Sequence, residues 1–306
     1  MRVAIIGAGG VGGYFGGRLA LSGADVAFVA RGDHLQAIQE RGLDVRAVDG
    51  DFTVRVQATD EPSAIGPVDI VVFSVKSYDT ESAGLLLRPL IEEDTAVISV
   101  QNGIDNEDKL ARIIGRGHVV GGAAFILAHI EAPGVVVQVA GPRTLVFGEL
   151  DGTRSERLER FAGACTAAGF GTTISDDIRK VLWDKYAFLT AMAGVTAASR
   201  LPMDAVLATP ESRNLYQQLM REVVAVAKAE GVDLDASIVD DKTTFAEGLG
   251  ANAYASMYYD LVAGKRFELD ALYGELTRRA KRHGVRVPAA DVIYALLRPW
   301  ELRTTT

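Results

Sequence analysis

The chain of 306 residues has little of several residue types on which common chemistries depend. It has one cysteine, Cys165, and four scattered histidines. A single thiol forms no internal disulfide, and the histidines lack metal-ligand spacing, so we expect a packing role for Cys165 and no metal site. No apolar run approaches the roughly 20 residues that span a bilayer. The formal net charge of −8 argues against a nucleic-acid partner. These absences predict a cytoplasmic enzyme.

Glycine, in contrast, is plentiful, and its most informative cluster lies near the start of the chain. The apolar run 3–6 leads into GAGGVG at 7–12, and a helix is expected from there to Leu21. Free N–H groups and the positive dipole end at such a helix start bind pyrophosphate. Gly7 would allow the tight turn, Gly9 would leave room for phosphates, and Gly12 would let helix and strand pack closely. The segment predicts a dinucleotide-binding turn, with an ordinary glycine-rich turn as the alternative.

The end of the second expected strand, 25–30, bears on which dinucleotide is bound. An enzyme that uses NAD usually carries an acidic residue there, which holds the 2′-hydroxyl of the ribose. This chain has Arg31 instead. A guanidinium pairs with a 2′-phosphate in a forked geometry, whereas an acid would repel it. Arg31 therefore predicts NADP (NADPH), and a solvated surface arginine is the alternative.

The two halves of the chain differ in periodicity. Up to about residue 174, short β-rich runs alternate with helical segments, which predicts an α/β fold with a parallel, doubly wound sheet. Strands are expected at 69–75, 95–100 and 119–128, a helix at 79–91, and an antiparallel addition at one sheet edge from 135–140 and 144–150. From about Asp176 onward the sequence has no pattern typical of a strand. Helices are expected there at 177–198, 210–230, 235–249, 253–263, 269–283 and 288–298. We predict a cofactor-binding domain over 1–174 and an all-helical substrate and catalytic domain over 175–306.

Two charged residues of the helical half lie on apolar stripes. Lys185 falls four residues after Val181 and four before Leu189. Either its stem packs while the ammonium reaches water, or it faces a cleft and can protonate an alkoxide. Glu268 continues a stripe through Leu272. It either complements a helix dipole or orients a catalytic ammonium and a substrate hydroxyl.

Two further candidates follow expected strands of the first half. Lys76 ends VVFSVK, and Asn102 lies in the Gln-Asn-Gly that follows 95–100. Ligands of open α/β sheets bind at the carboxyl ends of the strands. Lys76 either approaches the cofactor or only ends a strand. Asn102 either offers its amide to the nicotinamide or the substrate, or forms a plain Asn-Gly turn.

Taken in order, these segments resemble the ketopantoate reductase (2-dehydropantoate 2-reductase) family over essentially the whole chain. The matching motifs are GAGGVG, Arg31, VVFSVK (71–76), QNGIDN (101–106), LWDKYAF (182–188), SMYYDL (256–261) and FELDALYG (267–274). The resemblance implies a Rossmann-type domain followed by a helical domain. It also implies reduction of a 2-oxo acid by NADPH, namely 2-dehydropantoate to pantoate in pantothenate biosynthesis.

The resemblance also implies roles for individual residues. Lys185 corresponds to the general acid, Glu268 to the partner of the lysine and of the product hydroxyl, and Ser256 to the group that holds the substrate carboxylate. Asn102 corresponds to a residue beside both nicotinamide and substrate. The residues expected to bind the cofactor are Gly7, Ala8, Gly9, Gly10, Val11, Gly12, Arg31, Lys76 and Asn102.

The chain departs from the family one and two helical turns beyond Lys185. Family members carry substrate-binding asparagines there, and this chain has Leu189 and Ala193. Loss of two carboxamides removes hydrogen bonds to a polar substrate. A reductase of the same build that acts on a less polar 2-oxo acid is therefore an alternative, and a non-catalytic NADP(H)-binding protein is another. The apolar helical half is a candidate surface for a homodimer.

Overall fold

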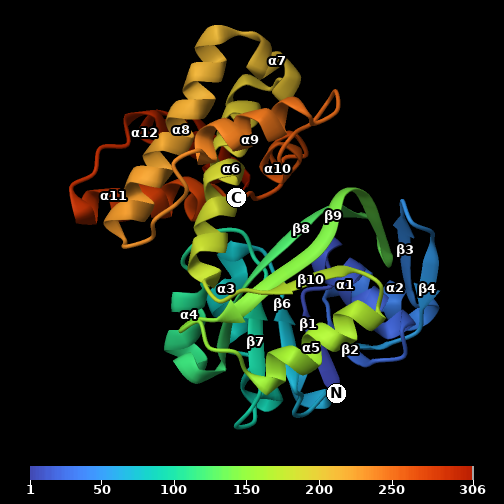
Figure 1. The fold of residues 1–306 in the computed structure, drawn as a ribbon. Coiled ribbons are helices and arrows are strands. Elements are labelled where there is room, and N and C mark those ends of the chain that lie inside the picture. The colour runs from blue at the N-terminus through green and yellow to red at the C-terminus, as the bar shows by residue number, and fades with distance from the viewer. Residues whose placement is uncertain (305–306) are drawn as a thin grey trace. The chain divides into compact units, whose positions relative to one another are not determined.

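The structure, a computed structural model, describes residues 1–304, so positions 305–306 of the predicted helical domain lie outside the described residues (Figure 1). The chain divides into two compact units. The first comprises Met1–Gln101 and Asn106–Ile178, and the second comprises Asn102–Asp105 and the residues from Arg179 onward. None of the helices in residues 1–304 combines the length and the hydrophobicity that a membrane span requires.

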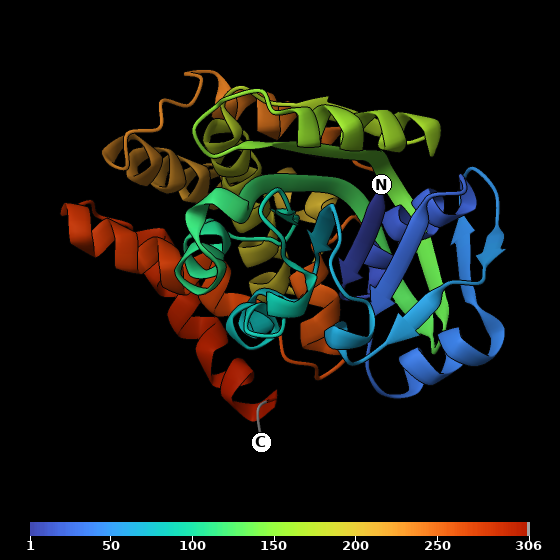
Figure 2. The ribbon, with the colours of Figure 1, turned by 90° about the horizontal axis from the view of Figure 1, so that it is seen from below.

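The first unit is built on one sheet, whose long strands β8 and β9 extend past their neighbours (Figures 1 and 2). Its strands are β1 (Arg2–Ile6), β2 (Asp25–Val29), β3 (Leu43–Ala47), β4 (Phe52–Val54), β5 (Gln57–Thr59), β6 (Ile70–Phe73), β7 (Ala96–Ser99), β8 (Val119–Ala132), β9 (Val135–Glu149) and β10 (Gly171–Ile174). The strand order is β4-β3-β9-β8-β7-β6-β1-β2-β5, and β10 pairs with β9. From β8 to β2 neighbouring strands are parallel, whereas β8 and β9 are antiparallel.

Helices cover both faces of this sheet. They are α1 (Gly10–Leu21), α2 (Gly32–Arg41), α3 (Thr80–Gly84), α4 (Asn106–Ile114) and α5 (Glu156–Ala167). Successive residues of β1 enter different cores, because side chains alternate along a strand. Val3 and Ile5 pack in a cluster that includes side chains of α1 and α5, while Ala4 and Ile6 join a cluster with Leu110 of α4. This burial on both faces confirms the predicted doubly wound α/β class.

The structure corrects two expectations for this unit. The helix expected at 79–91 is short, since α3 ends at Gly84 and Pro89 lies in a separate 3-10 turn. The runs 135–140 and 144–150 are not two strands: they form the single strand β9, which lies between β8 and β3 rather than at an edge. Positive φ angles at Gly141 and Arg143 and shifts in register make the strand irregular there without reversing it.

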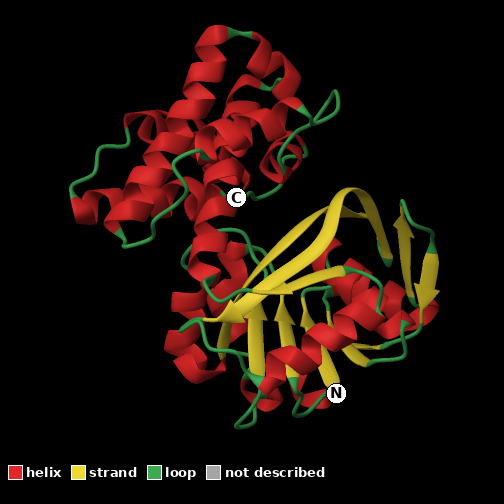
Figure 3. Ribbon diagram, viewed as in Figure 1, coloured by secondary structure: helices red, strands yellow, loops and turns green. Residues whose placement is uncertain are grey.

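The second unit is helical, as predicted (Figure 3). It contains α6 (Ile178–Ser199), whose first residue is counted with the first unit, α7 (Met203–Ala208), α8 (Pro210–Ala229), α9 (Ile238–Glu247), α10 (Ser256–Val262), α11 (Glu275–His283) and α12 (Pro288–Thr304). The helix expected at 269–283 begins with a π-helical turn, Asp270–Gly274, before α11. The short helix α7 was not predicted.

Candidate active site

The glycine turn between β1 and α1 has the geometry that a close approach of backbone requires. Gly7 has φ +98°, in the region that side chains rarely adopt, and its N–H donates to the Val29 carbonyl at 3.0 Å. A Cβ at Gly12 would lie 2.1 Å from the Gly7 carbonyl oxygen. At Gly9, the residue that precedes α1, an added Cβ would meet nothing within 4 Å. The turn is therefore tightly packed at Gly7 and Gly12, whereas the space beside Gly9 is open.

A pocket of about 250 Å³ lies beside this turn, where β1 and β2 end. It is lined by Gly7, Ala8, Gly9 and Arg31 of the predicted cofactor residues, together with His34 and Asp60 among others. Gly10, Val11, Gly12, Lys76 and Asn102 are not among its lining residues, although Val75 beside Lys76 is. The next strand in the sequence, β2, pairs with one edge of β1, whereas β6 pairs with the other edge. This reversal of strand order is where open α/β sheets bind ligands.

Arg31 follows Ala30, the first residue after β2, and the Arg31 side chain is 75% exposed. Its Nη2 donates to Oδ2 of Asp79 at 2.9 Å. That pair uses one of the five N–H donors of the guanidinium, which leaves others able to bind an anion. Asp60, also exposed, brings a carboxylate to the same pocket.

His34 lines this pocket and was not singled out from the sequence. Its Nε2 lies 2.8 Å from the Ala8 carbonyl oxygen, and its Nδ1 accepts the Gly134 N–H at 3.0 Å. The ring therefore fits as the neutral form with its hydrogen on Nε2. Desolvation lowers the pKa of His34, and the bond to Ala8 opposes this only in part. Its place shortly after Arg31 was the available sequence signal.

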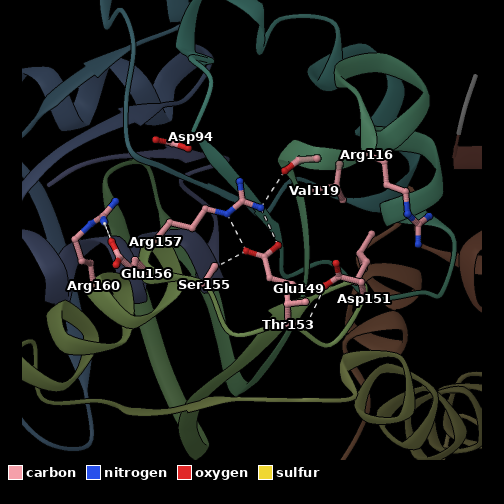
Figure 4. Close-up of a pocket in the computed structure, with 12 residues that line it drawn as sticks. Asp94, Arg116, Val119, Glu149, Asp151, Thr153, Ser155, Glu156, Arg157 and Arg160 are labelled. Carbon is pink, nitrogen blue, oxygen red and sulfur yellow. Dashed lines mark hydrogen bonds and ion pairs between the residues drawn. The ribbon is translucent and has the colours of Figure 1, made fainter.

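A larger pocket of about 620 Å³ lies elsewhere in the first unit, where β7 and β8 begin and β9 ends (Figure 4). Its central arginine, Arg157, donates to both carboxylate oxygens of Glu149, at 2.8 and 2.7 Å. Ser155 also donates to Glu149. Because the guanidinium charge is already neutralised and the pocket adjoins the amino ends of parallel strands, we do not assign a dinucleotide to it.

Two candidates for the reaction meet in the helical unit. Asn102 Nδ2 donates to Oε2 of Glu268 at 3.4 Å, although the two residues are 166 positions apart. Glu268 is 7% exposed and lies just before the π-helical turn. Gly103 has φ +113°, which permits the chain to turn directly after Asn102. A carboxylate and a carboxamide are thereby brought together.

Lys185 lies in α6 and is half-buried, and Ser256 is the first residue of α10 and also half-buried. Two buried tyrosines tie α6 to the segment that follows Glu268. The Tyr186 hydroxyl lies within hydrogen-bonding distance of the Ala271 and Leu272 carbonyls, and Tyr273 donates to the Thr190 carbonyl at 2.6 Å. Burial raises the pKa of both phenols, so they remain donors. Tyr186 and Tyr273 thus fix the backbone beside Lys185 and beyond Glu268.

The two departures from the family differ in exposure. Leu189 is half-buried, whereas Ala193 is fully buried. Cys165 is also buried, and burial raises its pKa to about 12, which is unfavourable for a nucleophile. Within residues 1–304 no group of three or more His, Cys, Asp or Glu is placed to hold a metal.

Comparisons with known proteins agree with this architecture. Residues 3–152 match the family "Ketopantoate reductase PanE/ApbA", and residues 177–301 match its C-terminal domain. A 2-dehydropantoate 2-reductase of Halobacterium salinarum is 32% identical, over 97% of this chain and 98% of that protein. The solved PanE/ApbA family ketopantoate reductase of Ralstonia eutropha is 34% identical with a TM-score of 0.92, over all of both chains. A D-mandelate dehydrogenase solved with NADH is 25% identical with a TM-score of 0.88, over 98% of this chain and 99% of that one.

The protein is thus an oxidoreductase of the class that joins a Rossmann-type sheet unit to a helical unit and uses a nicotinamide cofactor. The chain belongs to the ketopantoate reductase family.

Proposed function

We propose that this chain reduces a 2-oxo acid to the 2-hydroxy acid with NADPH, and that its substrate is 2-dehydropantoate. The observation that carries this proposal is the hydrogen bond between Asn102 and Glu268, which brings two distant family motifs to one place. We assign cofactor binding to residues 1–174, and substrate binding and catalysis to residues 175–306 together with Asn102.

The cofactor assignment rests on the fit of the glycine turn and Arg31. The open side of Gly9 leaves space for phosphates, and the α1 N-terminus offers N–H donors there. Arg31 would hold a 2′-phosphate in exchange for part of its pairing with Asp79. Asp60 supports the second candidate, NADH, because an acid favours the 2′-hydroxyl. The dehydrogenase similar in structure was solved with NADH.

When bound, the reduced nicotinamide supplies the hydride that is added to the substrate carbonyl carbon. In our proposal the ammonium of Lys185 polarises the carbonyl and donates a proton to the oxygen that becomes the hydroxyl. Glu268 orients that ammonium and the new hydroxyl. Asn102 holds Glu268 and contacts substrate and nicotinamide, and Ser256 holds the substrate carboxylate. The burial of Glu268 strengthens these interactions, because nearby charges are less screened than in water.

A less polar 2-oxo acid is the second candidate substrate. Leu189, one helical turn after Lys185, supports it, since an isobutyl group offers no hydrogen bond to a substrate hydroxyl. The similarity to a mandelate dehydrogenase points in the same direction.

The test is oxidation of NADPH and NADH by the purified protein with a panel of 2-oxo acids. The panel contains 2-dehydropantoate, aliphatic 2-oxo acids and phenylglyoxylate. The highest kcat/KM with NADPH and 2-dehydropantoate would support the proposal, and a preference for an apolar member would favour the second substrate. Binding of NADPH without turnover of any member would contradict the enzymatic role and support a non-catalytic binding protein.

A further inference from the structure

The segment Asn102–Asp105 follows β7 in the sequence but packs as part of the helical unit. Two features of Ile104 hold this segment in the helical unit. The Ile104 side chain is 8% exposed and belongs to the hydrophobic core of that unit. The Ile104 carbonyl oxygen accepts a hydrogen bond from Nη2 of Arg279 at 3.2 Å. Asn102 is two residues away, with the turn at Gly103 between them.

Arg279 of α11 is itself firmly placed. Its residue exposure is 6%, its Nε donates to Glu275 at 2.8 Å, and its Nη1 donates to Glu230 at 2.8 Å. Two carboxylates thus orient the planar guanidinium, and the third nitrogen is directed at Ile104. A lysine could not reproduce these three directions, because an ammonium lacks the rigid fork.

We infer that Arg279 is a positioning residue, which holds the Asn102–Asp105 segment so that Asn102 meets Glu268. The bond from Asn102 to Glu268 is 3.4 Å long, near the limit for a hydrogen bond, so a small displacement of the segment would break it. The inference rests on the proposed function, because that function gives Asn102 and Glu268 their roles.

The experiment compares Arg279→Met with the neighbouring Arg278→Met. Arg278 also pairs with Glu275, at 2.9 Å, but its other partner is Asp270. Removal of Arg279 leaves neither carboxylate alone, since Arg278 remains on Glu275 and His283 remains 2.9 Å from Glu230. If Arg279→Met still fails to fold, Arg279→Lys, which keeps the charge without the fork, takes its place.

The first readout is amide hydrogen exchange over residues 102–106, which needs no activity. Arg279→Met should accelerate exchange there, and Arg278→Met should not. Unchanged exchange in the folded Arg279 variant overturns the inference. The hydrogen-exchange measurement tests the inference even if the wild-type protein reduces no 2-oxo acid. That outcome would overturn only the proposed function.

The second readout is a double-mutant cycle with Asn102→Ala. A displacement of about 1 Å in a reacting group can cost about 100-fold in rate, so we expect Arg279→Met to lower kcat by about 10- to 100-fold. In the Asn102→Ala background the same substitution should have almost no further effect, because the residue through which it acts is gone. Additive effects of the two substitutions would overturn the inference.

Discussion

The two units assemble their candidate sites in different ways. In the sheet unit, one short turn contributes Gly7 to Gly9, and the segment after β2 contributes Arg31, to the lining of the proposed cofactor pocket. In the helical unit, the proposed reaction centre draws on Asn102, Lys185, Ser256 and Glu268, which come from four separate segments. The geometry of a contiguous turn is determined by its own backbone. A dispersed set depends on long-range bonds such as those of Tyr186, Tyr273 and Arg279.

The sharpest test of the dispersed site is Lys185→Ala. Loss of a positioned general acid should lower kcat by about 10²- to 10⁴-fold and leave the Kd of NADPH almost unchanged. Lys180→Ala is the matched control, because Lys180 lies in the same helix and pairs with Asp235 at 2.9 Å. Steady-state kinetics and fluorescence titration of NADPH measure the two quantities. Turnover at the wild-type level would remove Lys185 from the mechanism.

The proposed cofactor pocket of the sheet unit is tested by Arg31→Ala. A charge-assisted hydrogen bond contributes about 1.5–3 kcal/mol, so the Kd of NADPH should rise about 10- to 100-fold while that of NADH changes little. Asp79→Asn removes the negative charge that competes for the guanidinium, and it should not weaken NADPH binding. Equal losses for the two cofactors in Arg31→Ala would contradict the assignment of the 2′-phosphate.

Two glycines of the turn separate folding from binding. Gly12→Ala would force a methyl group to within 2.1 Å of the Gly7 carbonyl, so the free energy of unfolding should fall by about 1–3 kcal/mol. Gly9→Ala meets open space at φ −72°, so its stability should match the wild type while its NADPH affinity falls. Urea denaturation and cofactor titration distinguish the two. Full NADPH affinity in Gly9→Ala would argue against phosphates at this position.

The smallest expected effect is a dependence of stability on pH. The folded protein holds the pKa of His34 below its ordinary value of 6.5, so the unfolded chain takes up this proton first as the pH falls. The contribution of His34 is therefore complete above pH 6.5 and is lost progressively below it. Urea midpoints at pH 7.5 and 5.5 should differ less in His34→Gln than in the wild type. His129→Gln, at an exposed position, should keep the wild-type difference.

The sequence predicted the architecture where local signals were strong. The glycine turn, the β-rich runs and the later helical periodicity defined an α/β unit followed by a helical unit. It missed β3 and β4, although Asp49-Gly50 between two alternating runs is a typical hairpin signal. It divided β9 because the glycine and proline of 141–142 resemble a turn. Tertiary pairing with β8 kept that segment extended.

The candidate site was predictable only in part, for the same reason. The apolar stripes indicated Lys185 and Glu268 as candidates, and the end of a strand indicated Asn102. The contact of Asn102 with Glu268 agrees with these candidates but does not test their roles. His34, Tyr186, Tyr273 and Arg279 were missed. Their contacts join residues distant in sequence, which no local period reveals.

The membership of Asn102–Asp105 in the helical unit has a practical consequence for protein engineering. A fragment that starts at Arg179 would leave an unfilled hole where Ile104 packs and would remove the carbonyl acceptor from a buried guanidinium. A chimaera that exchanges helical units between relatives should therefore carry these four residues along with the helices. Chain order alone would place the cut in the wrong position.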